Sequence, residues 1–142
     1  MDHTPPSAGF FSYSTLMSFK ISKIHHIKLT VRDLNVSKGF YGTLPGFKCV
    51  AEYPDFVMFF VGNFYLGLTT HNKTKGTFDE TVTGLDHVSF EVASEEELHE
   101  ALAFFEEKQI NHDRIEKLSN GLQVLVFRDP DNIQLELTYK PT

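Results

Sequence analysis

An internal repeat limits the folds that this sequence can adopt. The segment HIKLTV beginning at His26 matches the segment HVSFEV beginning at His87. A residue suited to cap a helix follows each segment at the same distance, Asp33 in the first copy and Ser94 in the second. Both pairs are offset by 61 positions, so the two copies align without gaps at their starts. Such a repeat indicates two copies of one supersecondary unit.

Each copy is predicted to form a strand, a helix and three further strands. Apolar residues alternate with polar ones in the first strand of each copy and in the last strand, and turn residues separate the other strand-like runs. The expected helices begin at Asp33 and at the capping box Ser94–Glu97. The ranges expected for the elements are strand 23–31, helix 34–41, strands 48–53, 56–61 and 64–69, then strand 86–92, helix 95–109 and strands 114–118, 122–128 and 133–139. Asn120-Gly121 predicts a type I′ hairpin turn, and residues 129–132 predict a type I turn.

The element order predicts an α+β fold made of two βαβββ modules. The modules are expected over residues 23–70 and 84–139 of one domain, 23–142, joined by the polar connector 71–83. A length of 142 residues suits a single domain of this kind. Residues 1–22 are interpreted as a mobile N-terminal arm, within which Met17 is an alternative start.

Composition excludes several classes of function. The formal net charge is −6, which disfavours nucleic acid as a partner because phosphate contacts need clustered cations. The single cysteine, Cys49, cannot form an internal disulfide, and we expect it to be buried and inert. No apolar stretch is long enough to span a membrane, and no Lys or Arg precedes Lys20 as in a signal peptide. The expected location is the cytoplasm.

Strand periodicity places three side chains that can bind a metal on the polar faces of their strands. His26 and His87 point away from the aliphatic residues of their strands, and Glu136 does the same in the last strand. If the sheet curls into a trough, two imidazoles and one carboxylate can converge on a divalent cation and leave positions open for a substrate. His25 is the rival of His26, but its parity places it on the aliphatic face.

Three further residues are candidates for a catalytic role. Lys28 lies two positions beyond His26, and Glu91 lies four positions beyond His87, so each shares a strand face with its histidine. Lys28 could neutralise an anionic substrate, and Glu91 could act as a general base if burial raised its pKa. Equally, the two could pair with each other or lie at a solvated rim. Tyr65 could donate a hydrogen bond to a bound oxygen, although strand tyrosines more often pack.

Three segments carry a resemblance to a known family. HHIKLTVRDLNVSKGFYGTLPGF, LDHVSFEV and FRDPDNIQLEL resemble the opening of the first module, the opening of the second module and the closing segment of the vicinal oxygen chelate superfamily. The resemblance implies that the two modules form an open, mostly antiparallel, barrel-like sheet with a metal site in its trough, and that the protein is a homodimer with a small-molecule substrate. It also implies one divalent metal ion held by His26, His87 and Glu136. The metal could be iron, manganese, zinc or nickel, and the ligands could come from one chain or from two.

Departures from the family patterns narrow the expected activity. Aligning LGLTT with LELTY puts Gly67 where Glu136 stands in the other module, which disfavours a four-ligand glyoxalase I or an epimerase. Val126 stands where ring-cleaving dioxygenases carry a tyrosine. The fosfomycin-resistance enzymes match best in ligand number. We therefore expect a metal-dependent lyase, thiol transferase or related enzyme. The alternatives are a binding protein of the bleomycin-resistance type and an Fe(II) extradiol-type dioxygenase.

Overall fold

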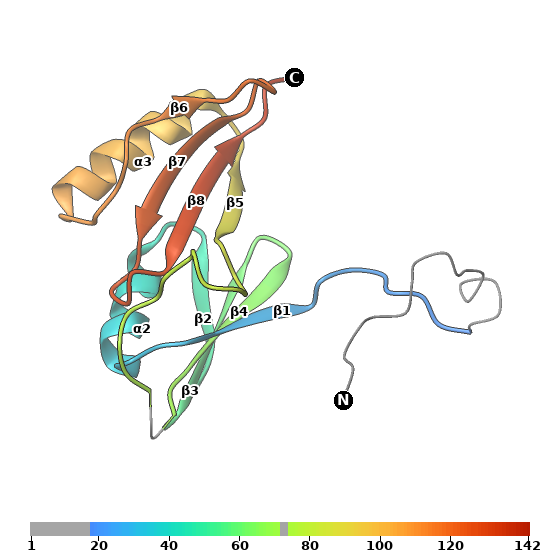
Figure 1. Ribbon diagram of the computed structural model, residues 1–142, viewed down its shortest axis with the longest axis vertical. Helices are drawn as coiled ribbons and strands as arrows, with labels where there is room; N and C mark the ends of the chain where they lie inside the picture. Colours follow the sequence, from blue (N-terminus) through green and yellow to red (C-terminus); the bar gives the residue numbers. More distant parts are fainter. Residues whose placement is uncertain (1–17, 72–73) are drawn as a thin grey trace.

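The computed structural model describes residues 18–71 and 74–142. The elements follow the order expected for two βαβββ modules. They are β1 (His26–Thr30), α2 (Leu34–Thr43), β2 (Phe47–Tyr53), β3 (Phe56–Val61), β4 (Phe64–Thr69), β5 (Val88–Val92), α3 (Glu95–Glu107), β6 (Glu116–Lys117), β7 (Gln123–Arg128) and β8 (Gln134–Tyr139). Figure 1 shows the two modules one above the other, each with its helix on the same side of its sheet.

Each module forms its own four-stranded sheet. The strand order is β1-β4-β3-β2 in the first sheet and β5-β8-β7-β6 in the second. The first strand of each module pairs in parallel with the last one, and the remaining pairs are antiparallel. The α+β class and the two-module order predicted from the sequence are therefore confirmed, and the two sheets stay open and separate within the chain.

The register shows which residues share a face. His26 lies beside Tyr65, and Lys28 lies beside Gly67. In the second sheet, Ser89 lies beside Glu136. The opposite, aliphatic faces of both sheets are buried against the helices, as the alternation in the sequence predicted.

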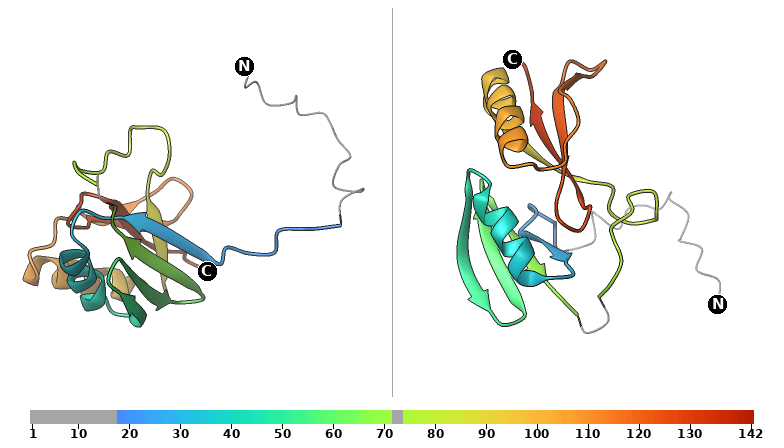
Figure 2. Two further views of the ribbon diagram at one scale, coloured as in Figure 1. Left: turned by 90° about the horizontal axis from the view of Figure 1, so that it is seen from below. Right: turned by 90° about the vertical axis from the view of Figure 1, so that its left-hand side faces the viewer.

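An aromatic contact joins the two modules. The Phe90 ring lies 5.3 Å from the Phe47 ring and 6.1 Å from the Phe64 ring, measured between centroids. These rings belong to one core that runs through both modules. The helix-side faces of the modules therefore pack together within one chain, and Figure 2 shows the connector between β4 and β5 running outside the sheets.

A buried polar network also ties the modules together. The Tyr41 hydroxyl of α2 donates to Oδ2 of Asp129 at 2.7 Å, and Arg32 Nε donates to Oδ1 of Asp131 at 2.7 Å. Ser37 adds a hydroxyl donor to Oδ2 of Asp131 at 3.3 Å. Both aspartates lie in the turn between β7 and β8, so this turn holds the second module against the helix of the first.

The local predictions succeeded at the caps. The Asp33 side chain accepts hydrogen bonds from the backbone N–H groups of Asn35 and Val36, and Ser94 accepts one from the N–H of Glu97. The turn after Asp129 closes with a hydrogen bond from the Asn132 N–H to the Asp129 carbonyl, as expected for a type I turn.

Two local predictions were wrong. The type I′ turn at Asn120-Gly121 requires a positive φ at both residues, but only Gly121 has one, at 90°. The Asn120 side chain instead accepts a hydrogen bond from the Leu122 N–H, within a longer loop closed by Leu118 and Leu122. Cys49 is exposed, because β2 is an edge strand with a register shift beside it.

Other predictions fall partly outside the described residues. Residues 1–17 of the proposed arm are not described, so the arm stays a prediction. In residues 18–71 and 74–142, no helix combines the length and the apolar character needed to cross a membrane.

Candidate metal site

Two of the three predicted ligands lie close together in the second module. His87 immediately precedes β5, Glu136 lies on β8, and the pairing of these strands brings the two side chains onto one sheet face. His87 Nε2 is 3.7 Å from Glu136 Oε1. Because metal–nitrogen and metal–oxygen bonds are about 2.0–2.2 Å long, one ion can reach both atoms.

Neighbouring side chains orient both of these groups. Asp86 Oδ1 lies 2.6 Å from His87 Nδ1, the ring nitrogen that faces away from Glu136. The Thr138 hydroxyl donates to Glu136 Oε1 at 3.0 Å, and Ser89 lies 2.5 Å from Thr138 between the hydroxyl oxygens. Glu136 retains 15% side-chain exposure, so the carboxylate remains accessible. Metal ligands in proteins are commonly held by such outer partners, and this donor set fits a divalent ion.

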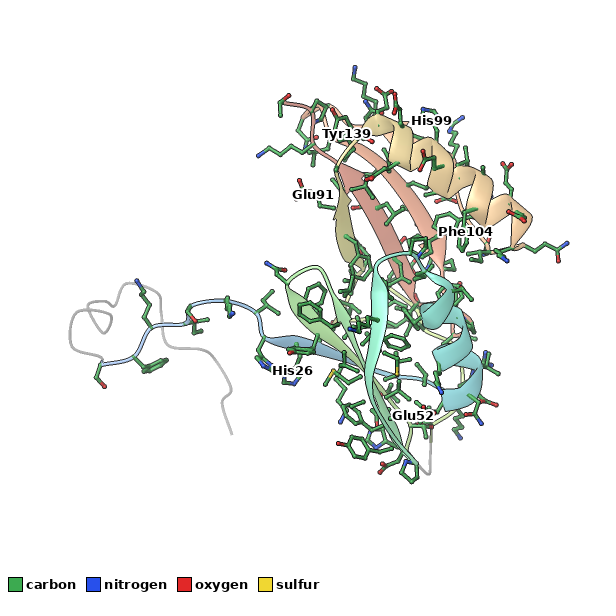
Figure 3. All side chains as sticks on the ribbon, turned by 180° about the vertical axis from the view of Figure 1, so that it is seen from behind. His26, Glu52, Glu91, His99, Phe104 and Tyr139 are labelled. Carbon is green, nitrogen blue, oxygen red and sulfur yellow. The ribbon has the colours of Figure 1, made fainter. Side chains whose placement is uncertain are left out.

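The third predicted ligand stands in the first module. His26 is exposed at the start of β1, and its Nδ1 lies 2.8 Å from Nδ1 of His25. The His25 ring also lies against Tyr65, 5.3 Å away between centroids. Figure 3 shows His26 on the lower module and Glu91 on the upper one, with the two sheets between them unjoined.

A single chain does not assemble the full predicted set. Within residues 18–71 and 74–142, no group of three His, Cys, Asp or Glu side chains is placed to hold one ion. The structure thus brings His87 and Glu136 together and leaves His26 apart. The assignment of the three ligands stays a prediction.

In the first module, an aromatic ring fills the space beside the position that corresponds to Glu136. Gly67 stands at the position that corresponds to Glu136, and a Cβ atom there would lie 3.1 Å from Phe56 Cε2 and 3.4 Å from Lys28 Cγ. The Lys28 ammonium sits 4.6 Å from the centroid of the Phe56 ring. The glycine therefore makes room for a cation–π pair, which sequence reasoning missed because Phe56 comes from a neighbouring strand.

The remaining candidates differ in their surroundings. Tyr65 is partly buried and packs on the Phe60 ring at 5.1 Å, on the face shared with His26. Glu91 is exposed and lies beside Thr138 in the register. The burial that a general base of this kind needs is therefore not present at Glu91 within one chain.

A cleft of about 830 Å³ lies between the modules on a different side. Its lining is mainly apolar and includes Phe47, Phe64, Phe90 and Phe104, and Glu91, Glu97 and Glu100 are its acidic members. None of the three predicted metal ligands lines it. We therefore place the candidate chemistry on the sheet faces that the helices leave uncovered, where the ligand-type side chains are.

Comparison with known proteins decides the family. A family model described as the Glyoxalase/Bleomycin resistance protein/Dioxygenase superfamily matches residues 23–137. The chain belongs to this superfamily. The resemblance inferred from the sequence is confirmed, and members of this superfamily include enzymes as well as non-catalytic proteins. The comparison with curated proteins found no match.

Solved structures of the superfamily share the fold. A glyoxylase/bleomycin resistance protein/dioxygenase domain from Frankia sp. EAN1pec is 29% identical, with a TM-score of 0.77 over 86% of this chain and 100% of that one. A lactoylglutathione lyase from Agrobacterium tumefaciens is 23% identical, with a TM-score of 0.69 over 84% of this chain and 94% of that one. A genomically encoded fosfomycin resistance protein from Listeria monocytogenes is 20% identical, with a TM-score of 0.71 over 86% of this chain and 96% of that one.

Proposed function

We propose that this protein is a divalent-metal-dependent enzyme that acts on a small, oxygen-rich substrate. The observation that carries the proposal is the placement of His87 Nε2 3.7 Å from Glu136 Oε1, with each group held by its own hydrogen-bond partner. A bound ion would act as a Lewis acid that stabilises negative charge on the substrate oxygens.

The third ligand, in this proposal, comes from a second copy of the chain. β1 and β5 are edge strands, and each pairs on one side only in the part of the chain that the structure describes. Free edges of this kind favour pairing with another chain. A homodimer in which β1 of one copy lies along β5 of the other would bring His26 to the pair formed by His87 and Glu136.

The charges of the two uncovered sheet faces support this pairing. The strands of the first sheet place His26, Lys28 and Lys48 on the face opposite α2, and no strand residue on that face is acidic. The corresponding face of the second sheet carries acidic residues on three strands, namely Glu91, Glu116 and Glu136, and the cation on the same face, Arg128, is paired with Glu80. Complementary potentials of this kind steer association and fix orientation.

The other inward residues take roles that match their chemistry. Lys28 would bind an anionic group of the substrate, and Tyr65 would donate a hydrogen bond to a substrate oxygen. Glu91 would move a proton once the second copy covers it. Because only three ligands are available and Gly67 supplies no base, the three-ligand layout of the fosfomycin-resistance enzymes is the nearest match, with a lyase or thiol transferase as the reaction class.

Metal content tests the site directly. Chelator-treated protein is reloaded with Zn²⁺, Mn²⁺, Ni²⁺ or anaerobic Fe²⁺, and bound metal is measured beside the His87→Ala variant. We expect the variant to lose the ion, whereas His99→Ala on the surface of α3 keeps it. Equal metal content in wild type and His87→Ala would contradict the proposed site.

Mixed dimers test whether the site spans two copies. His26→Ala and His87→Ala homodimers should both fail to bind metal. If ligands come from two chains, a heterodimer of the two variants contains one intact site, so a random mixture regains about a quarter of the wild-type metal content. If the ligands come from one chain, mixing restores nothing.

A second function, ligand binding without chemistry, is favoured by the aromatic side chains of the first sheet. Phe56, Met58, Phe60 and Tyr65 share the face opposite α2 and are only partly buried. Partly exposed apolar residues on one face are typical of a binding surface. Tight binding of an aromatic compound by protein that never retains metal would support this alternative. Oxygen uptake with a catechol panel after Fe²⁺ loading would instead indicate the dioxygenase.

A further inference from the structure

A chain of hydrogen bonds leads from the connector to His87. The Glu80 carboxylate accepts two hydrogen bonds from Arg128, Nη1 to Oε1 at 2.7 Å and Nη2 to Oε2 at 3.0 Å. Arg128 Nη2 also donates to Gln134 Oε1 at 3.1 Å. Gln134 Nε2 donates in turn to Asp86 Oδ1 at 2.9 Å, the same oxygen that lies 2.6 Å from His87 Nδ1.

The chemistry of each group fixes the direction of every bond in this chain. A guanidinium only donates, so the amide oxygen of Gln134 must face Arg128 and its NH₂ group must face Asp86. A carboxylate only accepts, so the ring hydrogen of neutral His87 must sit on Nδ1. The lone pair is then on Nε2, the nitrogen that faces Glu136.

The equivalent histidine of the first module has no such support. His25 occupies the position of Asp86, and its Nδ1 lies 2.8 Å from Nδ1 of His26. Either imidazole can donate in that contact, so the contact does not decide which nitrogen of His26 carries the hydrogen. The hydrogen bonds therefore fix the tautomer of His87 and leave the tautomer of His26 undetermined.

We propose that Glu80, Arg128, Gln134 and Asp86 form a positioning relay that fixes the tautomer and ring orientation of His87 for metal binding. The inference rests on the proposed metal site. It assigns a role to Glu80 in the polar connector, a segment that the sequence suggested only as a link between modules. Outer partners of metal-ligating histidines contribute about ten- to hundredfold in metal affinity.

Zn²⁺ affinity, measured by competition with a chromophoric chelator on the full chain, tests the relay. We expect Asp86→Ala to weaken binding by about ten- to hundredfold. Asp86→Asn should lie between this variant and wild type, because its amide oxygen can still accept the Nδ1 hydrogen. Glu80→Gln should weaken binding less, since three side chains stand between Glu80 and His87.

The matched control is Asp79→Asn, which makes the same charge change one residue away. The Asp79 side chain bonds only to the Thr81 backbone N–H and hydroxyl among the described residues, so the loss of its charge should leave Zn²⁺ affinity unchanged. Urea unfolding of each variant shows whether a loss of affinity merely follows a loss of stability, because a structural role alone would change unfolding without changing affinity in the folded protein.

The outcomes separate the two proposals. If His87→Ala loses Zn²⁺ but Asp86→Ala, Asp86→Asn and Glu80→Gln bind as wild type does, the relay is overturned and the metal site stands. A His87→Ala variant with wild-type affinity overturns the metal site, and the relay with it. Should Asp86→Ala fail to fold, Asp86→Asn and Glu80→Gln against Asp79→Asn still decide the result.

Discussion

Replacing Tyr41 with phenylalanine should destabilise the fold by removing one buried donor. Tyr41 is fully buried, and its hydroxyl is the donor that reaches Oδ2 of Asp129, which is only 6% exposed. The other oxygen of Asp129 accepts from the N–H groups of Asp131 and Ile133. Because a hydrogen bond to a charged group contributes about 1.5–3 kcal/mol, Tyr41→Phe should lower the free energy of unfolding by about the same amount.

The cost of this substitution should depend on pH. Burial raises the pKa of Asp129 above its ordinary value, and the Tyr41 hydroxyl counteracts that rise. Burial, with Asp129 nearby, also raises the pKa of Tyr41, so its hydroxyl remains a donor at neutral pH. Because the pKa of Asp129 is higher in the folded protein than in the unfolded one, the folded protein binds a proton at Asp129 more readily as pH falls. Protonation then removes the buried negative charge. Without the Tyr41 hydroxyl the pKa of Asp129 rises further, so the deficit of Tyr41→Phe should shrink as pH falls into the range where Asp129 takes up its proton.

Urea unfolding at fixed protein concentration measures both effects. Tyr53→Phe is the matched control because Tyr53 is 58% exposed. We expect the control to unfold with wild type. If Tyr41→Phe also unfolds with wild type, or if its deficit grows as pH falls, the account of the buried network is wrong.

Two further substitutions test other contacts. Gly67→Glu should lower the free energy of unfolding by about 1–3 kcal/mol, since its Cβ would lie 3.1 Å from the Phe56 ring. Gly39→Glu is the control, because a Cβ there meets nothing within 4 Å. Equal urea midpoints for the two variants would refute this prediction. Glu80→Gln should remove a component of acid stability, because the Arg128 hydrogen bonds lower the pKa of Glu80 from 4.5 to about 2. The stability difference from wild type should therefore be complete above about pH 5 and disappear as pH falls toward 2, as acid titration followed by circular dichroism would show.

The fold was predictable wherever it depends on neighbours in sequence. Period-2 alternation placed His26 and Lys28 on one face of β1, and the register with Tyr65 and Gly67 agrees. The capping residue Asp33 was recognisable because its side chain bonds to N–H groups two and three positions ahead. These features are local, so the sequence alone carries enough information to predict them.

Contacts between distant residues were not predictable in the same way. The segment Asp129–Asn132 predicted only a turn, yet its carboxylates reach α2 across separations of 88 and 94 positions. The packing of the two modules through Phe47 and Phe90 depends on the same long-range contacts. That packing is what leaves His26 apart from the other two candidate ligands, because it joins the modules by their helix sides.

The repeat therefore does not make the two halves chemically equivalent. Both copies place a histidine at the start of an edge strand, but Asp86 precedes His87 where His25 precedes His26. Likewise, Glu136 accepts a hydrogen bond from the Thr138 hydroxyl, whereas at the corresponding position Gly67 has no side chain and the Phe56 ring packs against it. The second module thus carries a supported pair of candidate ligands, while the first carries an aromatic face with the Lys28 cation. In the proposed homodimer, a two-fold axis would set the first module of each copy against the second module of the other, which is why the mixed-dimer experiment tests the site and the assembly together.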